Sequence, residues 1–368
     1  MTQPAFVRRF RLTATLTIGA VYLLILVGGI VRSTGSGMGC PDWPKCFGQW
    51  VPPTDVSQLP ANYKEIYLAQ RVAKNQRVAG TLQKLGFSEV AREVFAHPTQ
   101  YIETDFNATK TWIEYVNRLL GALIGLFIFA TVLAAGPFLR RDPLVFWAAL
   151  VSFITVGIQG WLGSLVVSTN LLPELVTIHM GLALVLVGLL IWALVRADRY
   201  AAVGEEPGAP AQTPAPAVRG GLGGLLVGLV LLTFGQIILG TQVREEIDLV
   251  AFGLNYLQRE QWVEQLGGAF LVHRSFSALL LLGNAYACWQ LYQTGHHDLR
   301  RLAVATMLVI GLEILAGIVL AYWAMPAAVQ PLHLTLGTLL FGVQFLALIR
   351  YRQAVKTTRL DRYPGVVA

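Results

Sequence analysis

Charged residues are scarce in this chain: of 368 residues, 13% are charged and 55% are hydrophobic. The mean hydropathy is +0.56. A soluble protein of this size needs more charge to cover its surface. The net charge of +7 does not indicate nucleic-acid binding, because the basic residues lie in loops and tails between apolar stretches. The composition therefore predicts an integral membrane protein.

Other common signatures are missing as well. No small-residue cleavage site ends the apolar run that follows Arg8, Arg9 and Arg11, so this run is interpreted as a first membrane span rather than a signal peptide. Gly-rich phosphate loops and hydrolase triads are absent from credible contexts. Any catalytic or binding site must therefore be built from residues outside these common motifs.

Long apolar stretches recur at the length that a hydrocarbon core of about 30 Å demands of a helix. In lipid the backbone must satisfy its own hydrogen bonds, so these stretches are helices. We expect eight spans, at residues 12–31, 112–135, 145–167, 174–196, 221–243, 270–292, 301–323 and 328–350. The predicted fold class is an all-α integral membrane protein with eight transmembrane helices.

The loops alternate in charge. Arginines concentrate before the first span, in every second loop and after the last span, whereas loops 168–173 and 324–327 carry no Lys or Arg and loop 244–269 is mainly acidic. The positive-inside rule therefore places both termini in the cytoplasm and the long loop 32–111 outside. Helical spacing of apolar residues within 61–95 predicts one or two water-exposed helices in that loop.

The segment 204–220, rich in Pro, Gly and Ala, is interpreted as a cytoplasmic linker between an N-terminal half, 1–203, and a C-terminal half, 221–368. The halves repeat at nearly constant offsets. The matched positions are Gly28, Val31 and Arg32 with Gly240, Val243 and Arg244; Asn117-Arg118 with His273-Arg274; Gln159 with Glu313; and His179 with His333. This pattern predicts two pseudo-symmetric four-helix bundles.

Three histidines, His179, His273 and His333, lie inside spans, about one turn from the outer end. His273 and His333 stand at the same depth of one half, which favours a haem bound by imidazole on both faces. Zinc is disfavoured because no Cys or carboxylate at that depth completes a tetrahedral set. The alternative is core histidines hydrogen-bonded to neighbours. In the first half, the position that matches His273 is occupied by Asn117, and asparagine is a poor ligand for haem iron.

Two kinds of charged residue accompany these histidines. Glu114, one turn outward from Asn117, could pass a proton beside a haem edge, or it could satisfy the helix dipole. Arginines suit bidentate pairing with haem propionates, or they could snorkel to lipid headgroups. The arginines considered are Arg32, Arg118, Arg244 and Arg274.

Cys40 and Cys46 flank a short run just outside the first span. An oxidising outer compartment favours a disulfide between them. The alternative is a pair of free thiols, one of them redox-active.

The run GGIVRSTGSGMGCPDWPKC at residues 28–46 closely resembles the haem A synthase family, as do the eight spans, the repeat and the histidine positions. The likeness covers nearly the whole chain apart from 47–108. It implies oxidation of a methyl group of haem O to the formyl group of haem A for terminal oxidases. It also implies a haem b between His273 and His333, a substrate haem on His179, catalysis by Glu114 and paired Cys40 and Cys46.

The family pattern has a histidine where this chain has Asn117, so the sequence does not identify the second ligand of the substrate haem. His97 in the outer loop is one alternative. The resemblance further implies the inner (plasma) membrane, a haem O synthase as supplier and the terminal oxidase assembly machinery as recipient. The sequence does not decide whether the chain forms a homo-oligomer. The alternatives are a membrane b-type cytochrome for electron transfer, an inactive assembly or scaffold relative, and a transporter.

Overall fold

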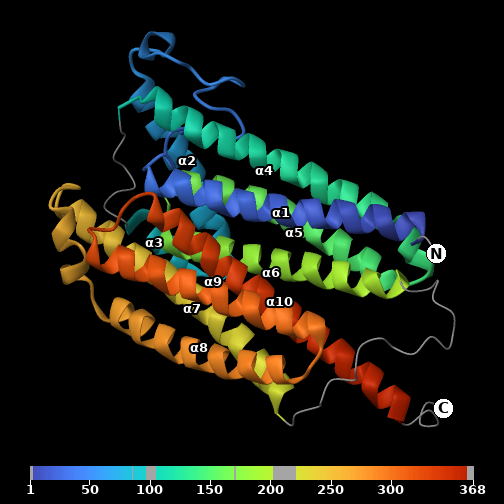
Figure 1. Cartoon of the computed structure of the whole chain (residues 1–368). Helices are drawn as coiled ribbons and strands as arrows, with labels where there is room; N and C mark the ends of the chain where they lie inside the picture. The colour runs from blue at the N-terminus through green and yellow to red at the C-terminus, as the bar shows by residue number, and fades with distance from the viewer. Residues whose placement is uncertain (1–2, 85, 97–104, 170, 202–220, 363–368) are drawn as a thin grey trace.

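The computed structural model describes residues 3–84, 86–96, 105–169, 171–201 and 221–362, and in this part of the chain all regular structure is helical. The expected linker 204–220 and His97 lie outside the described residues. The α-helices are α1 Ala5–Ser33, α2 Tyr63–Lys84, α3 Ser88–Ala96, α4 Ala108–Ala135, α5 Pro143–Ser168, α6 Pro173–Ala197, α7 Leu222–Gly253, α8 Gly268–Gln293, α9 His297–Tyr322 and α10 Val329–Arg362 (Figure 1).

Within the described residues, seven helices are by themselves long and apolar enough to cross a membrane: α1, α4, α5, α6, α7, α9 and α10. The eighth expected span, α8, reaches that threshold only together with the segment Arg259–Gln265, from which it is bent by 83°. Its lower hydropathy follows from polar residues such as His273, Arg274 and Asn284. The all-α integral membrane class is confirmed.

Local sequence explains where several helices begin. Asn107 caps α4 by accepting a hydrogen bond from the backbone N–H of Lys110 at 3.0 Å. Pro143 and Pro173 occupy the first turns of α5 and α6, where a missing N–H costs no helical hydrogen bond.

The prediction of a loop at 244–269 is wrong for its first ten residues, because α7 continues to Gly253. Val243, Ile247 and Ala251 recur on one face of this extension and are buried against Trp262 and Met325. This apolar stripe, set among charged residues, keeps the chain helical beyond the expected end of the span.

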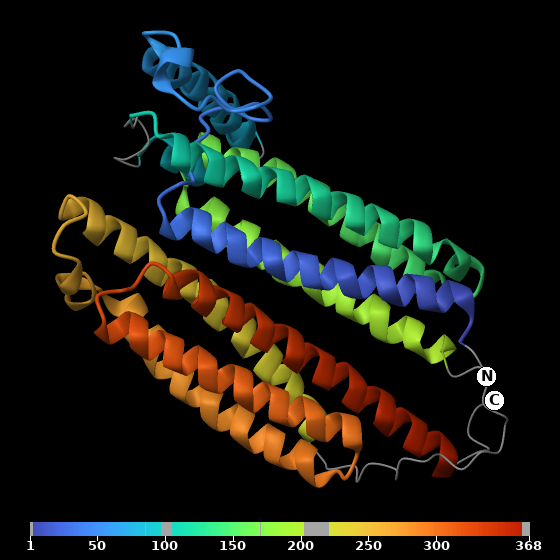
Figure 2. The ribbon, with the colours of Figure 1, turned by 45° about the horizontal axis from the view of Figure 1, so that its top comes forward.

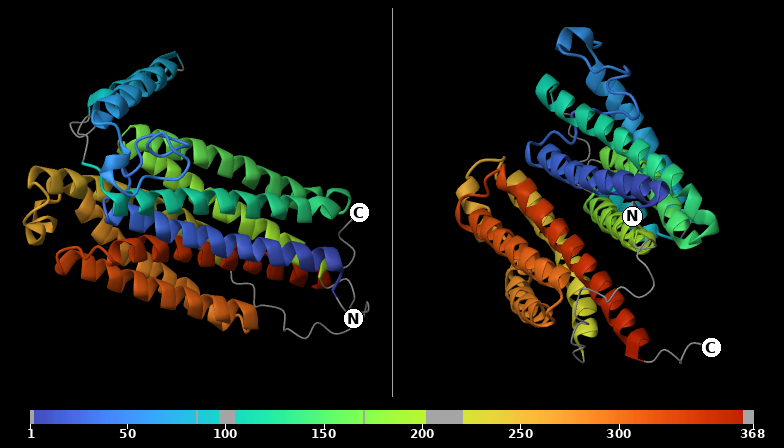
Figure 3. Two further views of the ribbon diagram at one scale, coloured as in Figure 1. Left: turned by 90° about the horizontal axis from the view of Figure 1, so that it is seen from above. Right: turned by 45° about the vertical axis from the view of Figure 1, so that its right-hand side comes forward.

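One or two helices were expected within 61–95, and the structure has two, α2 and α3. They lie at one end of the bundle, which we call the α2 end, and the start of α1 and the end of α10 lie at the opposite end (Figures 1 and 3). The loop 34–55, which joins α1 to this outer pair, lies at the α2 end too.

The spanning helices form two groups of four (Figure 2). In the first, α1 packs on α4 and α5 packs on α6; in the second, α7 packs on α8 and α9 packs on α10. The groups meet where α1 and α6 contact α7 and α10. At the end opposite α2, Asp198 pairs with Arg11, at 3.0 Å, and with Arg350, which links the two groups.

Candidate functional site

The three intramembrane histidines all lie at the α2 end, and each packs over a glycine of a neighbouring helix. A Cβ atom added at Gly240 on α7 would lie 3.3 Å from Cε1 of His273, and one at Gly317 on α9 would lie 3.3 Å from Cε1 of His333. The corresponding distance from Gly163 to His179 is 3.9 Å. Small residues thus let the helices approach and leave room for the rings.

His273 on α8 and His333 on α10 face each other across the second group of helices. Their ring centroids are 6.4 Å apart and the ring planes are inclined by 76°. The Nδ1 atoms of both rings are buried and form no hydrogen bond in the structure. The two imidazoles are therefore close enough to share one metal atom.

The first group of helices differs at the equivalent place. Asn117 lies on α4, and its Oδ1 atom is buried without a hydrogen-bond partner. Gly28 on α1 corresponds to Gly240 in the repeat, but no heavy atom lies within 4 Å of a Cβ added there. The space that the His273 ring fills in the second group is thus open in the first, where His179 is the intramembrane imidazole.

Cys40 and Cys46 form a disulfide, as expected, with Cα atoms 4.9 Å apart. This disulfide loop is held against the start of α4. Thr111 donates its hydroxyl to the carbonyl oxygen of Gly39 at 2.8 Å, and a Cβ at Gly39 would lie 2.6 Å from the carbonyl oxygen of Lys110. Only glycine permits this close approach.

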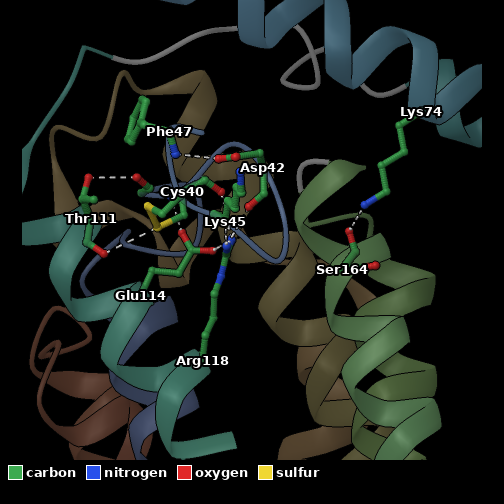
Figure 4. A network of polar contacts seen from close by, with 11 residues as sticks. Cys40, Asp42, Lys45, Phe47, Lys74, Thr111, Glu114, Arg118 and Ser164 are labelled. Carbon is green, nitrogen blue, oxygen red and sulfur yellow. Dashed lines mark hydrogen bonds and ion pairs between the residues drawn. A yellow bond between two sulfur atoms is a disulfide. The ribbon is translucent and has the colours of Figure 1, made fainter. Parts of the chain in front are cut away.

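Glu114 is almost fully buried beneath the disulfide loop (Figure 4). Its Oε2 atom accepts a hydrogen bond from the backbone N–H of Cys40 at 2.7 Å, and its Oε1 atom pairs with the guanidinium of Arg118. Both oxygens are therefore engaged. The carboxylate joins α4 to the loop, one turn from Asn117 on the same helix.

The four arginines considered for propionates occupy different environments. Arg118 donates to the backbone carbonyls of Asp42 at 2.6 Å, Cys40 at 2.9 Å and Lys45 at 3.1 Å, so its guanidinium is committed to the disulfide loop. Arg274 donates to the hydroxyl of Tyr322 at 2.9 Å.

Arg32 on α1 and Arg244 on α7 are equivalent in the repeat, and both bind Asp248. The nitrogen-to-oxygen distances are 2.8 Å and 2.7 Å. Asp248 was not predicted to take part in the site, because it lies in the part of α7 that was expected to be a loop. The Nε atoms of both arginines are buried and have no hydrogen-bond partner.

Two further residues escaped prediction. Glu313 on α9 lies 3.2 Å, Oε1 to Nδ1, from His333. Lys74 on α2 reaches down to donate to the carbonyl oxygen of Ser164 on α5 at 2.9 Å (Figure 4). Burial, with the nearby charge of Arg118, holds the pKa of Lys74 below its usual value. The repeat matched Glu313 with Gln159, and a carboxylate inside an expected span was the signal that could have found it.

The chain matches the model of one protein family, described as cytochrome oxidase assembly protein, over residues 11–84 and 76–345. A relative from Maricaulis maris is 27% identical over 91% of this chain and 94% of its own length. Relatives from Roseobacter denitrificans and Paracoccus denitrificans are each 23% identical, over 91% and 92% of this chain and 86% and 87% of their own. All three bear the name "Heme A synthase". The family match spans most of the sequence, and the chain therefore belongs to the cytochrome oxidase assembly protein family.

Proposed function

We propose that this chain is a haem A synthase, which oxidises a methyl group of haem O to the formyl group of haem A. The observation that carries this proposal is the placement of His179, His273 and His333 at one end of two matching groups of four helices. Imidazole is the common protein ligand of haem iron. Family membership and the names of the relatives support the same activity.

We infer that His273 and His333 hold a haem b. Two metal–imidazole bonds of about 2 Å each, together with the distance from each ring nitrogen to its centre, account for the 6.4 Å between the ring centroids. Both Nδ1 atoms are enclosed by protein, so the Nε2 atoms are the ones available to iron. When bound there, the haem supplies one-electron transfer.

The substrate haem is assigned to the first group of helices, with His179 as its ligand. The carboxamide of Asn117 does not offer the nitrogen lone pair that an imidazole offers, and the space beside Gly28 is open. One face of the substrate iron would then be open or carry water, to which Asn117 can hydrogen-bond through its free Oδ1 atom. An open face also eases exchange of substrate and product.

We assign proton transfer to Glu114, because converting a methyl to a formyl group releases protons and this carboxylate is one turn from Asn117. Arg118 positions the Glu114 carboxylate by forming an ion pair with it and by holding the disulfide loop through hydrogen bonds. Arg32 and Arg244, with unpartnered Nε atoms, and Arg274 are the arginines that we expect to contact propionates, as donors in charge-assisted hydrogen bonds.

The proposed setting follows the sequence. We place residues 1–203 on the substrate side, 221–368 on the haem b side, both termini in the cytoplasm and the α2 end outside a plasma membrane. A haem O synthase would supply the substrate, the terminal oxidase assembly machinery would receive the product, and the chain could act as a homo-oligomer.

A b-type cytochrome that only transfers electrons is the second candidate, because it would use the same histidines and need no Glu114. Pigment extraction from the purified protein separates the two. Haem b together with haem O or haem A supports the synthase, whereas haem b alone supports the cytochrome.

The haem b site has its own test. Replacing His273 or His333 with Ala should abolish the reduced optical band of haem b, because one ligand is lost in each variant. His296→Ala, in the turn at the opposite end of the bundle, is the control and should leave the band unchanged. An unaltered haem b content in both site variants would exclude this pair as ligands.

A further inference from the structure

Glu313 is a carboxylate in the membrane-spanning part of α9, where an ionisable group is costly unless it has a partner. Its Oε1 atom lies 3.2 Å from Nδ1 of His333. Its Oε2 atom is buried without a hydrogen-bond partner, and the contact to Nδ1 is not aligned as a hydrogen bond either. One oxygen of the carboxylate thus lacks a donor, and the imidazole nitrogen beside the other oxygen lacks an acceptor.

The backbone on both helices makes room for this pair. A Cβ added at Gly337, one turn after His333 on α10, would lie 3.1 Å from Oε1 of Glu313. A Cβ added at Gly317, one turn after Glu313 on α9, would lie 3.3 Å from Cε1 of His333. A side chain at either glycine would push one partner away from the other. The two glycines therefore permit the close approach of carboxylate and ring.

The other intramembrane histidines have a different neighbour. Gln159, which matches Glu313 in the repeat, donates its amide to the backbone carbonyl of His179 at 2.9 Å. Gln236 donates in the same way to the carbonyl of His273 at 2.8 Å. Neither amide contacts an imidazole nitrogen, and the Nδ1 atoms of both rings have no partner. Of the three rings, His333 alone has a carboxylate at Nδ1 in the described structure.

We propose that Glu313 is a positioning residue for the haem held by His273 and His333. It accepts a hydrogen bond from Nδ1–H of His333, which fixes the tautomer and directs Nε2 to the iron, as carboxylates do for other metal-bound histidines. Its negative charge, poorly screened in the membrane, favours the ferric over the ferrous haem, because ferric iron carries one more positive charge. The reduction potential of this haem is lowered as a result. This inference rests on the proposed function.

A redox titration of the haem b band tests the proposal. Glu313→Gln keeps the size and one acceptor oxygen but removes the charge, so the haem should be retained and its potential should rise. The expected change in the ratio of reduced to oxidised haem is about tenfold, which equals about 59 mV for one electron. Glu313→Asp keeps the charge and should retain most of the original potential. The control Gln159→Leu removes the matching side chain in the other half and should leave this potential unchanged.

A second variant covers the case in which Glu313→Gln does not fold. Gly337→Ala keeps Glu313 in the sequence, but the added methyl group pushes the carboxylate away from the ring of His333. The reduction potential should therefore rise, by less than in Glu313→Gln. An unchanged potential in the variants that retain haem would overturn the positioning role and leave the haem site itself intact. Absence of haem b from the unmodified protein would instead overturn the proposed function.

Discussion

Asn117 is the residue at which the two halves differ most in chemistry. A Cβ added at Gly240 would lie 3.3 Å from the ring of His273, the counterpart of Asn117, whereas the space beside Gly28, the counterpart of Gly240, is open. A histidine at 117 therefore has room to adopt the same arrangement. In the proposed function, the first half therefore has space for a second imidazole but carries an amide in its place.

We predict that Asn117→His converts the substrate haem from high spin to low spin, because a second imidazole would bind the iron. Electron paramagnetic resonance of ferric protein loaded with haem in both halves measures this change. The control Asn117→Ala should remain high spin. Two low-spin signals in the unmodified protein would contradict a single-ligand site and direct attention to His97.

We predict that Glu114→Gln lowers haem A production at least tenfold, so that haem O accumulates, while haem b is retained. The amide still accepts a hydrogen bond from the N–H of Cys40 but can no longer take up a proton. Pigment analysis of membranes that supply haem O measures both products. Thr111→Val is the matched control, because it removes a contact of the same loop without touching the carboxylate. Equal loss in both variants would make the role of Glu114 structural.

Among the elements, α2 has the least expected position, because this helix of the outer loop docks onto a membrane helix. Lys74 forms a polar link by donating to the carbonyl oxygen of Ser164 at 2.9 Å, and Val78 and Leu82 of α2 pack against an apolar cluster that includes α5 side chains. Ser164 follows Gly163, over which the ring of His179 packs. A hydrogen bond from a charged donor contributes about 1.5–3 kcal/mol. The outer helix is thus tied to the backbone of α5 beside the glycine that packs against His179.

We predict that Lys74→Ala increases proteolytic cleavage within α2 about tenfold, because local opening becomes easier by the energy of that hydrogen bond. Limited proteolysis of the detergent-solubilised protein measures the rate. Lys84→Ala, an exposed position at the end of the same helix, should cleave at the original rate. A rate unchanged by Lys74→Ala would exclude this contact as the anchor of α2.

The same contact predicts a pH dependence. The pKa of Lys74 is lower in the folded chain than in the unfolded chain, so between the two values the unfolded chain binds more protons. The contribution of Lys74 to docking should therefore rise with pH through this window and level off above about 10.4. Protease protection of α2 measured up to that pH should show a rise that Lys74→Met removes. The same rise in both proteins would contradict the assignment to Lys74.

At the scale of the whole molecule, the two halves are joined at both ends by carboxylates that take two arginines each. Asp198 binds Arg11 and Arg350 at one end. Asp248 binds Arg32 and Arg244 at the other. Because α1 belongs to one half and α7 to the other, the Asp248 cluster fixes the position of these two helices relative to each other.

We predict that Asp248→Asn lowers the free energy of unfolding by about 1 kcal/mol, a small effect because the side chain is 44% exposed and its ion pairs are screened. In this variant the positive charges of Arg32 and Arg244 face each other without the carboxylate between them. Added salt should reduce the loss of unfolding free energy, because it screens this repulsion. Thermal unfolding in detergent at low and high salt measures it. Asp298→Asn, an exposed carboxylate on α9, should have no effect; a loss that is equal for both variants would exclude a specific role of the cluster.

The sequence alone determined the membrane class, the approximate spans, the depth of the three histidines and the pairing of Cys40 with Cys46, because hydropathy, charge alternation and short spacing are local properties of the chain. Only the tertiary structure decided that Arg118 binds the disulfide loop, that Asp248 collects two arginines and that Glu313 meets His333. These contacts join different helices or a helix and a distant loop, so they depend on how each helix is rotated and shifted along its axis. The packing of whole faces sets that rotation and shift, and no short pattern in the sequence encodes them.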